Sequence, residues 1–121
     1  MGTFRGPYKL IIMENVEWTK IEFLAYVLLY AAHCNYFEDS EELNFIFSKV
    51  DDATFHRIHT EVVVDSEELK LKKIQEYVFK NKLSQTEKEA ILKDIKQVFF
   101  ADGTVDIFEK ELFTTLKKMF T

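Results

Sequence analysis

The sequence is poor in the residues that build tight turns. It contains three glycines and one proline in 121 residues, and Gly2, Gly6 and Pro7 all lie near its start. From Tyr8 onward there is one glycine, Gly103, and no proline. β-Sandwiches and β-barrels need a turn about every 8–12 residues, usually built on Gly, Pro or Asn-Gly. This scarcity disfavours those folds, and the composition also excludes collagen-like and disordered chains.

Cysteine and long apolar runs are scarce as well. Cys34 is the single cysteine, so the chain cannot form an internal disulfide, which is typical of a reducing compartment. Its place in an apolar run predicts a buried, inert thiol. The longest uncharged apolar run, Phe23–Ala32, is too short to cross a bilayer, and no secretory signal is apparent. We therefore expect a cytoplasmic protein without direct membrane insertion.

Basic residues are fewer than acidic ones. The chain has 16 Lys and Arg against 21 Asp and Glu, a net charge of −5. This argues against sequence-independent binding of nucleic acid and against docking on anionic lipid, and it leaves cations and basic partners open. The densest basic segment is interleaved with glutamates, which favours a solvated face over a docking surface for an acidic partner. Its lysines are Lys70, Lys72, Lys73, Lys80 and Lys82.

Apolar residues recur at helical spacing along most of the chain. Residues 1–14 hold the turn residues and a short β-prone run, so we expect an arm there, either frayed or strapped across the helices. The first helix should begin after an N-cap at Asn15, run to about Cys34 and be buried on most sides. Five more helices are expected, over about residues 39–50, 52–64, 66–81, 85–101 and 107–121, with residues 62–64 equally compatible with a short extended piece. The sequence thus predicts an all-α fold, with a single compact domain of about six helices over residues 15–121.

Expected caps and inward faces refine this prediction. Ser84 and Glu87 form a capping box, Asp39 and Asp106 should begin helices, and Asp65 or Ser66 should begin another. The residues expected to face inward on the second and fourth helices are Leu43, Ile46, Phe47 and Val50, and Leu71, Ile74 and Val78.

An internal repeat appears when the chain is shifted by 67 residues. Two helix–turn–helix units then align, and the segment 35–42 falls on 102–109. In both copies an Asx residue ends the first helix, an Asp opens the second four residues later, and a Glu follows after three more. The domain is therefore expected to contain two related units.

The second copy of the turn has a complete structural explanation. Gly103 can adopt a positive φ just past a helix end without steric cost. Asp106 and Glu109 match an acidic capping box, and both charges favour the positive end of the next helix. Helix capping alone therefore accounts for this turn.

The alternative is a divalent-cation site. Residues 102–109 match positions 5 to 12 of an EF-hand loop, including the Gly at position 6 and the Glu at position 12, but Val98 and Phe100 stand at positions 1 and 3, where the first ligands belong. A looser Ca²⁺ or Mg²⁺ site would use oxygens alone. Its ligands would be Asp102, Asp106 and Glu109, joined by Asn35, Asp39 and Glu42 if the two turns lie side by side.

The segment Ala101-Asp102-Gly103-Thr104-Val105-Asp106-Ile107-Phe108-Glu109 resembles the tellurite-resistance TerB-like family. The same fold includes the N-terminal domain of DjlA-type membrane-anchored co-chaperones. The first copy departs from the family pattern, with Asn35-Tyr36 in place of Asp-Gly and Glu38 in place of an apolar residue. The resemblance implies an all-helical domain with two related units. It also implies a role in stress responses or metal-associated complexes and no enzymatic activity.

Other constellations are weaker. His56 and His59 share a helical face with Asp52 one turn earlier, which could begin a zinc site but falls short of a closed ligand set. No nucleophile elbow, P-loop or dinucleotide fingerprint is present. We therefore expect a non-catalytic module that binds a protein partner, with a homodimer left open, no certain cofactor, and cation binding as the alternative function.

Overall fold

The computed structural model describes residues 17–34, 40–100 and 107–120. Of residues 33, 34, 40–42, 108 and 109 it describes the backbone alone. The described residues form helices and no strand, which confirms the all-α prediction. The helices are α2 (Lys20–Cys34), α3 (Ser40–Lys49), α4 (Asp52–Val64), α5 (Glu67–Asn81), α6 (Gln85–Phe99) and α7 (Ile107–Met119).

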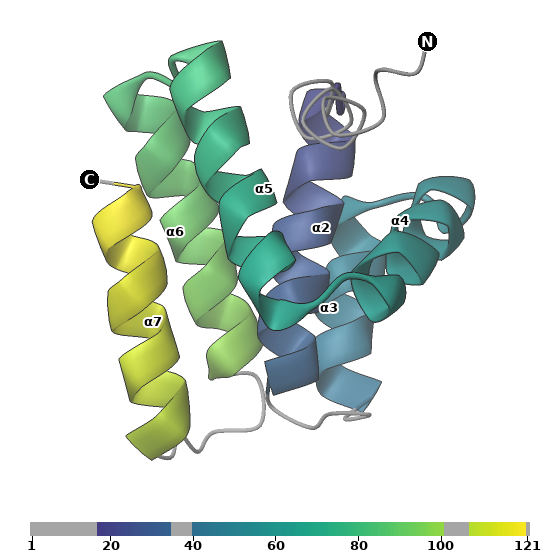
Figure 1. Ribbon diagram of the computed structural model, residues 1–121. Helices are drawn as coiled ribbons and strands as arrows, with labels where there is room; N and C mark the ends of the chain where they lie inside the picture. The colour runs from purple at the N-terminus through teal and green to yellow at the C-terminus, as the bar shows by residue number, and fades with distance from the viewer. Residues whose placement is uncertain (1–16, 35–39, 101–106, 121) are drawn as a thin grey trace, which may run out of the picture.

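Helix α2 is the centre of the fold (Figure 1). It packs against α3, α4, α5 and α6. Its residues 25–32 are buried without interruption, because neighbours cover every side of this part of the helix. The prediction of a central, mostly apolar first helix is thus confirmed.

The start of α2 differs from the sequence prediction. Residues 17–19 are not helical, and the helix begins at Lys20 rather than after Asn15, which lies outside the described residues. The Glu22 amide donates to Thr19 Oγ1 at 3.2 Å, and the Thr19 amide donates to Glu22 Oε1 at 2.9 Å. These reciprocal bonds satisfy two backbone N–H groups at the helix end, so Thr19 is the N-cap of α2.

The other described caps follow the sequence closely. Asp51 caps α4 by accepting from the Thr54 amide at 3.1 Å, and Ser66, not Asp65, caps α5. Both halves of the capping box of Ser84 and Glu87 are present at the start of α6. Helix α6 ends at Phe99, about two residues before the predicted end. None of the described helices combines the length and the apolar character needed to cross a membrane.

The two repeated units are arranged in the same way. Helix α3 starts at residue 40 and α7 at residue 107, the same shift of 67 that aligns the sequences. In Figure 1, α2 and α6 run in the same direction, and α3 and α7 both return from the end where α2 and α6 finish. Helix α6 packs against α2, α3 and α7, so the second unit packs against the first through α6.

One predicted core position is wrong. Ile46 and Val50 of α3 are buried and Leu43 is half-buried, but Phe47 is 42% exposed and packs on Phe55 at 4.6 Å between ring centroids. Helix α4 is the neighbour on that side, and it covers only part of the Phe47 ring. On α5, Ile74 is buried and Leu71 and Val78 are half-buried, as expected.

Candidate functional site

The acidic turns predicted to hold a cation fall outside the described residues. This applies to Asn35, Asp39, Asp102, Gly103 and Asp106, and equally to the side chains of Glu42 and Glu109 and the thiol of Cys34. What the structure does place is the flanking backbone: the ends of α2 and α6 and the starts of α3 and α7 lie at one end of the molecule (Figure 1). The cation site stays a prediction.

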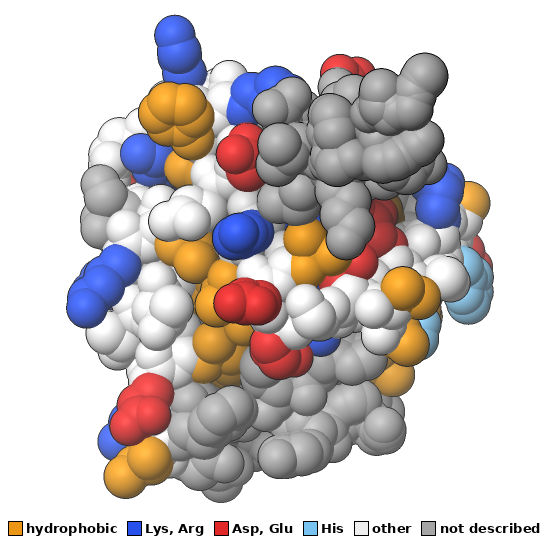
Figure 2. Space-filling view, in the orientation of Figure 1, with side chains coloured by type: hydrophobic (Ala, Val, Ile, Leu, Met, Phe, Trp, Pro, Cys, Tyr) orange, Lys and Arg blue, Asp and Glu red, His pale blue; other side chains and the backbone are white. Residues whose placement is uncertain are grey.

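The histidine pair lies against an aromatic ring. His59 stacks on Phe55 with centroids 5.6 Å apart, and His56 meets the same ring edge-on at 5.3 Å. The histidine side chains lie at one edge of the face in Figure 2. In the part of the chain that the structure describes, no three His, Cys, Asp or Glu residues are grouped to hold a metal ion. The pair therefore lies at the edge of the core, against Phe55.

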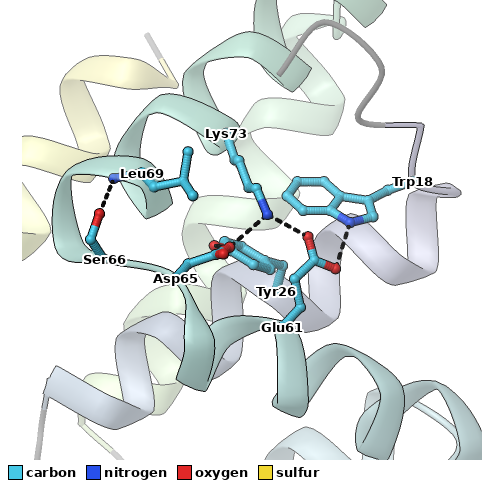
Figure 3. A network of polar contacts seen from close by, with 7 residues as sticks. All are labelled: Trp18, Tyr26, Glu61, Asp65, Ser66, Leu69 and Lys73. Atoms are coloured by element: carbon cyan, nitrogen blue, oxygen red, sulfur yellow. Dashed lines mark hydrogen bonds and ion pairs between the residues drawn. The ribbon is translucent and has the colours of Figure 1, made fainter. Parts of the chain in front are cut away.

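A buried ionic network joins three helices (Figure 3). Lys73 of α5 contacts Glu61 of α4 and Asp65, the residue that caps the end of α4. Its Nζ donates to Glu61 Oε2 at 2.8 Å and to Asp65 Oδ2 at 2.6 Å. Tyr26 of α2 donates its hydroxyl to the same Asp65 oxygen at 2.6 Å. Trp18 Nε1 donates to Glu61 Oε1 at 3.4 Å. The Lys73 side chain is 11% exposed and that of Asp65 is 9% exposed, so this pair is largely closed to water, whereas the Glu61 side chain is 30% exposed.

The electrostatics of this network hold Tyr26 and Lys73 in their ordinary charge states. Burial and the hydrogen bond to Asp65 raise the pKa of Tyr26, which keeps the phenol protonated. Burial alone would lower the pKa of Lys73, but the hydrogen bonds and charges of Asp65 and Glu61 outweigh it and raise that pKa. A catalytic base or nucleophile needs a shift toward neutrality. The network is thus suited to fixing α2, α4 and α5 together.

The buried lysines correct the interpretation of the basic segment as a solvated face. Lys73 is 9% exposed, and Lys70, which pairs with Glu67 at 3.1 Å, is 7% exposed. Both share a helical face with the buried Ile74 and Tyr77. That register is the signal the sequence offered, because lysines on an apolar stripe are buried with their partners. No comparable pattern in the sequence indicated that Glu61 and Asp65 are the partner carboxylates.

Three aromatic residues, Trp18, Phe23 and Tyr77, pack beside this network. Trp18 packs against Tyr26 at 4.6 Å, Phe23 at 6.0 Å and Tyr77 at 6.1 Å between ring centroids. Phe23 and Tyr77 stack face to face at 4.0 Å. Both are buried at 1% and 4% exposure, so this pair is a rigid wall whose position is set by α2 and α5.

That wall lines a groove between α2, α5 and α6. The groove has a volume of about 210 Å³ and a mostly apolar lining. This volume is below the roughly 300–1,000 Å³ of typical small-molecule pockets, and it suits a large side chain better than a cofactor. The lining residues are Lys20, Phe23, Leu24, Tyr77, Leu83, Glu87, Ala90, Ile91 and Asp94.

Two ion pairs stand at the rim. Lys20 Nζ contacts Glu87 Oε2 at 2.6 Å, and Lys49 Nζ contacts Asp94 Oδ1 at 3.6 Å. The hydrogen bonds from Lys20 and from the Ser84 backbone lower the pKa of Glu87 to about 2, and Glu87 in turn raises the pKa of Lys20. Burial raises the pKa of Tyr77. The groove therefore has an apolar floor and charged walls, and sequence reasoning missed it because its residues come from distant segments.

Compared with protein-family models, with curated proteins and with solved structures, the chain matches none. The resemblance to the TerB-like family consequently rests on residues 101–109 and stays a prediction.

Proposed function

We propose that this protein is a non-catalytic helical interaction module that binds a protein partner through the groove between α2, α5 and α6. The observation that carries the proposal is the groove itself. Its stacked wall of Phe23 and Tyr77 is supported from behind by Trp18. A concave apolar site with a rigid wall can bind an anchor side chain without losing conformational entropy of its own. Such preorganisation is a usual basis of tight docking.

The ionic network of Lys73, within the part of the chain that the structure describes, offers no group tuned for proton transfer, and this supports a binding role over catalysis. In the ionic network of Lys73 the pKa shifts move Tyr26 and Lys73 away from neutrality. On the face shown in Figure 2, basic and acidic side chains are scattered singly, so this face offers no continuous basic patch for nucleic acid. A helical module of the TerB-like type, acting in a cytoplasmic stress- or metal-response complex, is the form of the proposal that the resemblance of residues 101–109 supports.

The proposal is tested with a displayed library of random peptides selected on the full chain. Ala90 lines the groove and is exposed, so Ala90→Trp fills the groove from a helix surface without entering the core. Selected peptides are expected to lose binding to this variant. Ala53→Trp is the matched control, since Ala53 is an exposed alanine on α4 that does not line the groove. Peptides that bind both variants equally, or a selection that yields no binder, would contradict the proposal.

Divalent-cation binding at residues 102–109 is the second candidate. It is favoured by the match to positions 5 to 12 of an EF-hand loop. Titration of the chain with millimolar Ca²⁺ or Mg²⁺ is expected to shift the amide NMR signals of this segment, and Asp102→Ala should weaken the response. Asp106→Ala should also lower stability by about 0.5–2 kcal/mol through the lost cap. Unchanged signals over 102–109 would exclude this function.

A further inference from the structure

The two carboxylates at the groove rim are fixed in place. Glu87 accepts from the Ser84 backbone N–H at 2.9 Å, while its own amide donates to Ser84 Oγ at 3.1 Å, so the capping box determines where its side chain points. The Asp94 side chain is 18% exposed, which limits its movement. The negative charges of the rim are therefore part of the rigid frame of α6.

The cations that face them are much freer to move. The Lys20 side chain is 79% exposed and that of Lys49 is 42% exposed. Exposed ion pairs of this kind add little stability, because each lysine is well solvated and loses side-chain entropy in the pair. A cation brought by a partner can therefore replace either lysine at small cost, whereas an incoming anion would face carboxylates that cannot withdraw.

The spacing of the carboxylates gives the length of the recognised segment. Glu87 and Asp94 are seven residues apart on α6, two turns or about 10.5 Å along the axis, and Ala90 and Ile91 line the groove between them. This makes a stripe of negative, apolar and negative surface. A helix with cations at positions i and i+7 and an apolar residue between them matches it, since those positions lie on one face.

We propose that the occupant of the groove is a basic amphipathic helix of a partner protein. One apolar side chain enters between Leu24, Tyr77 and Ile91, and a Lys or Arg one turn to either side contacts Glu87 and Asp94. The net charge of −5 adds long-range attraction for such a segment. This inference rests on the proposed function, which it narrows from any protein partner to one of a stated chemistry.

The test uses two synthetic helical peptides of equal length, free of Trp and Tyr. Each has Leu at its central position, and they carry Arg or Glu at the two flanking positions. Trp18, the single tryptophan of the chain, contacts both stacked wall residues, so its fluorescence reports occupation of the groove. The basic peptide is expected to bind at least about tenfold more tightly than the acidic one. Glu87→Gln and Asp94→Asn should each weaken it by about two- to fivefold, the range expected of a partly exposed ion pair.

Glu89→Gln is the matched control, because it removes one negative charge from an exposed position of α6 outside the groove. Basic-peptide binding that falls equally in all three variants would reflect net charge alone and would overturn the inference. Equal or tighter binding of the acidic peptide would overturn it too. If library-selected peptides occupy the groove but carry no cations, the proposed function stands and the basic helix is excluded; if no peptide responds to Ala90→Trp, both fail.

Discussion

Lys73 shows how one side chain can hold three helices in register. Its ammonium group bridges Glu61 and Asp65, while the Tyr26 hydroxyl satisfies a further lone pair of Asp65. Buried ion pairs gain little over an apolar replacement when both partners are present, but removing one partner leaves a buried charge without compensation. The network therefore sets the geometry of the α4–α5 corner, and with it the position of Trp18 behind the groove wall.

Replacing this lysine should be costly. Lys73→Met keeps the length of the side chain but removes its charge, and two carboxylates then face each other without a cation. The free energy of unfolding is expected to fall by about 3–5 kcal/mol in urea denaturation. Lys72→Met, at the neighbouring exposed position, should change it by less than about 0.5 kcal/mol. A comparable small effect of both substitutions would mean that the network is not energetically coupled to folding.

Glu87 gives stability a defined dependence on pH. Its pKa falls from an ordinary value of 4.5 to about 2 in the folded chain. A lowered pKa means that its stabilising contribution is complete above about pH 4.5 and is lost as the pH falls toward 2. The difference in unfolding free energy between the wild type and Glu87→Gln should therefore shrink over that interval. A constant difference for Glu87→Gln across that interval would contradict the assignment.

At the scale of the element, the turn between α5 and α6 contains the one described non-glycine residue with a positive φ. Lys82 ends α5 with φ 48° and ψ 58°, the left-handed region in which a side chain is strained. The chain accepts this because the next residues must reverse direction: Leu83 returns to line the groove and Ser84 begins α6. Glycine is the usual residue at such a helix end.

Lys82→Gly should consequently stabilise the protein. Relief of the strain outweighs the added freedom of the unfolded chain, and we expect a gain of up to about 1 kcal/mol, seen as a higher melting temperature. Lys80→Gly, one position inside the last turn of α5, should instead cost about 1 kcal/mol. If both substitutions lower the melting temperature, the backbone of the turn differs from the one described.

The helix boundaries also show what the sequence could and could not predict. Caps such as Asp51, Ser66 and Ser84 were predictable because the side chain bonds to an amide three residues ahead. The pair of Thr19 and Glu22 has the same three-residue spacing, so the sequence also contains the signal for the observed start of α2. The exposure of Phe47 depends on which neighbour covers that face of α3, and local sequence pattern does not determine this.

The candidate site likewise has one part that the sequence could predict and one that it could not. The acidic turns could be proposed from sequence because their residues are contiguous, and the groove could not, because Leu24, Tyr77 and Ala90 come from three helices. The helical period placed Leu71, Ile74 and Val78 on one apolar face but could not show which helix faces meet. The spacing of residues along the sequence also did not indicate which carboxylates pair with Lys73.

At the scale of the whole molecule, a single core should make unfolding cooperative. Helix α2 contacts α3, α4, α5 and α6, and Phe23 packs on Tyr77 of α5 and on Phe120 after α7. Among the described helices, all of those around α2 except α7 make a substantial contact with it. Helix α7 packs against α6 instead. The loss of α2 from the core would therefore leave the remaining helices without the surface they bury.

Two probes can test this cooperativity, because Trp18 fluorescence reports the aromatic wall and far-UV circular dichroism reports all helices. Their urea transitions are expected to coincide, with a slope of about 1–3 kcal/mol per molar urea. Phe23→Ala should lower both midpoints together, through a loss of about 3–5 kcal/mol for a buried aromatic ring. Phe79→Ala should leave both nearly unchanged, since Phe79 is 81% exposed. A fluorescence transition that precedes the loss of helix would show that the α2–α5 contact opens on its own, and the groove would then not be the rigid site from which its partner was inferred.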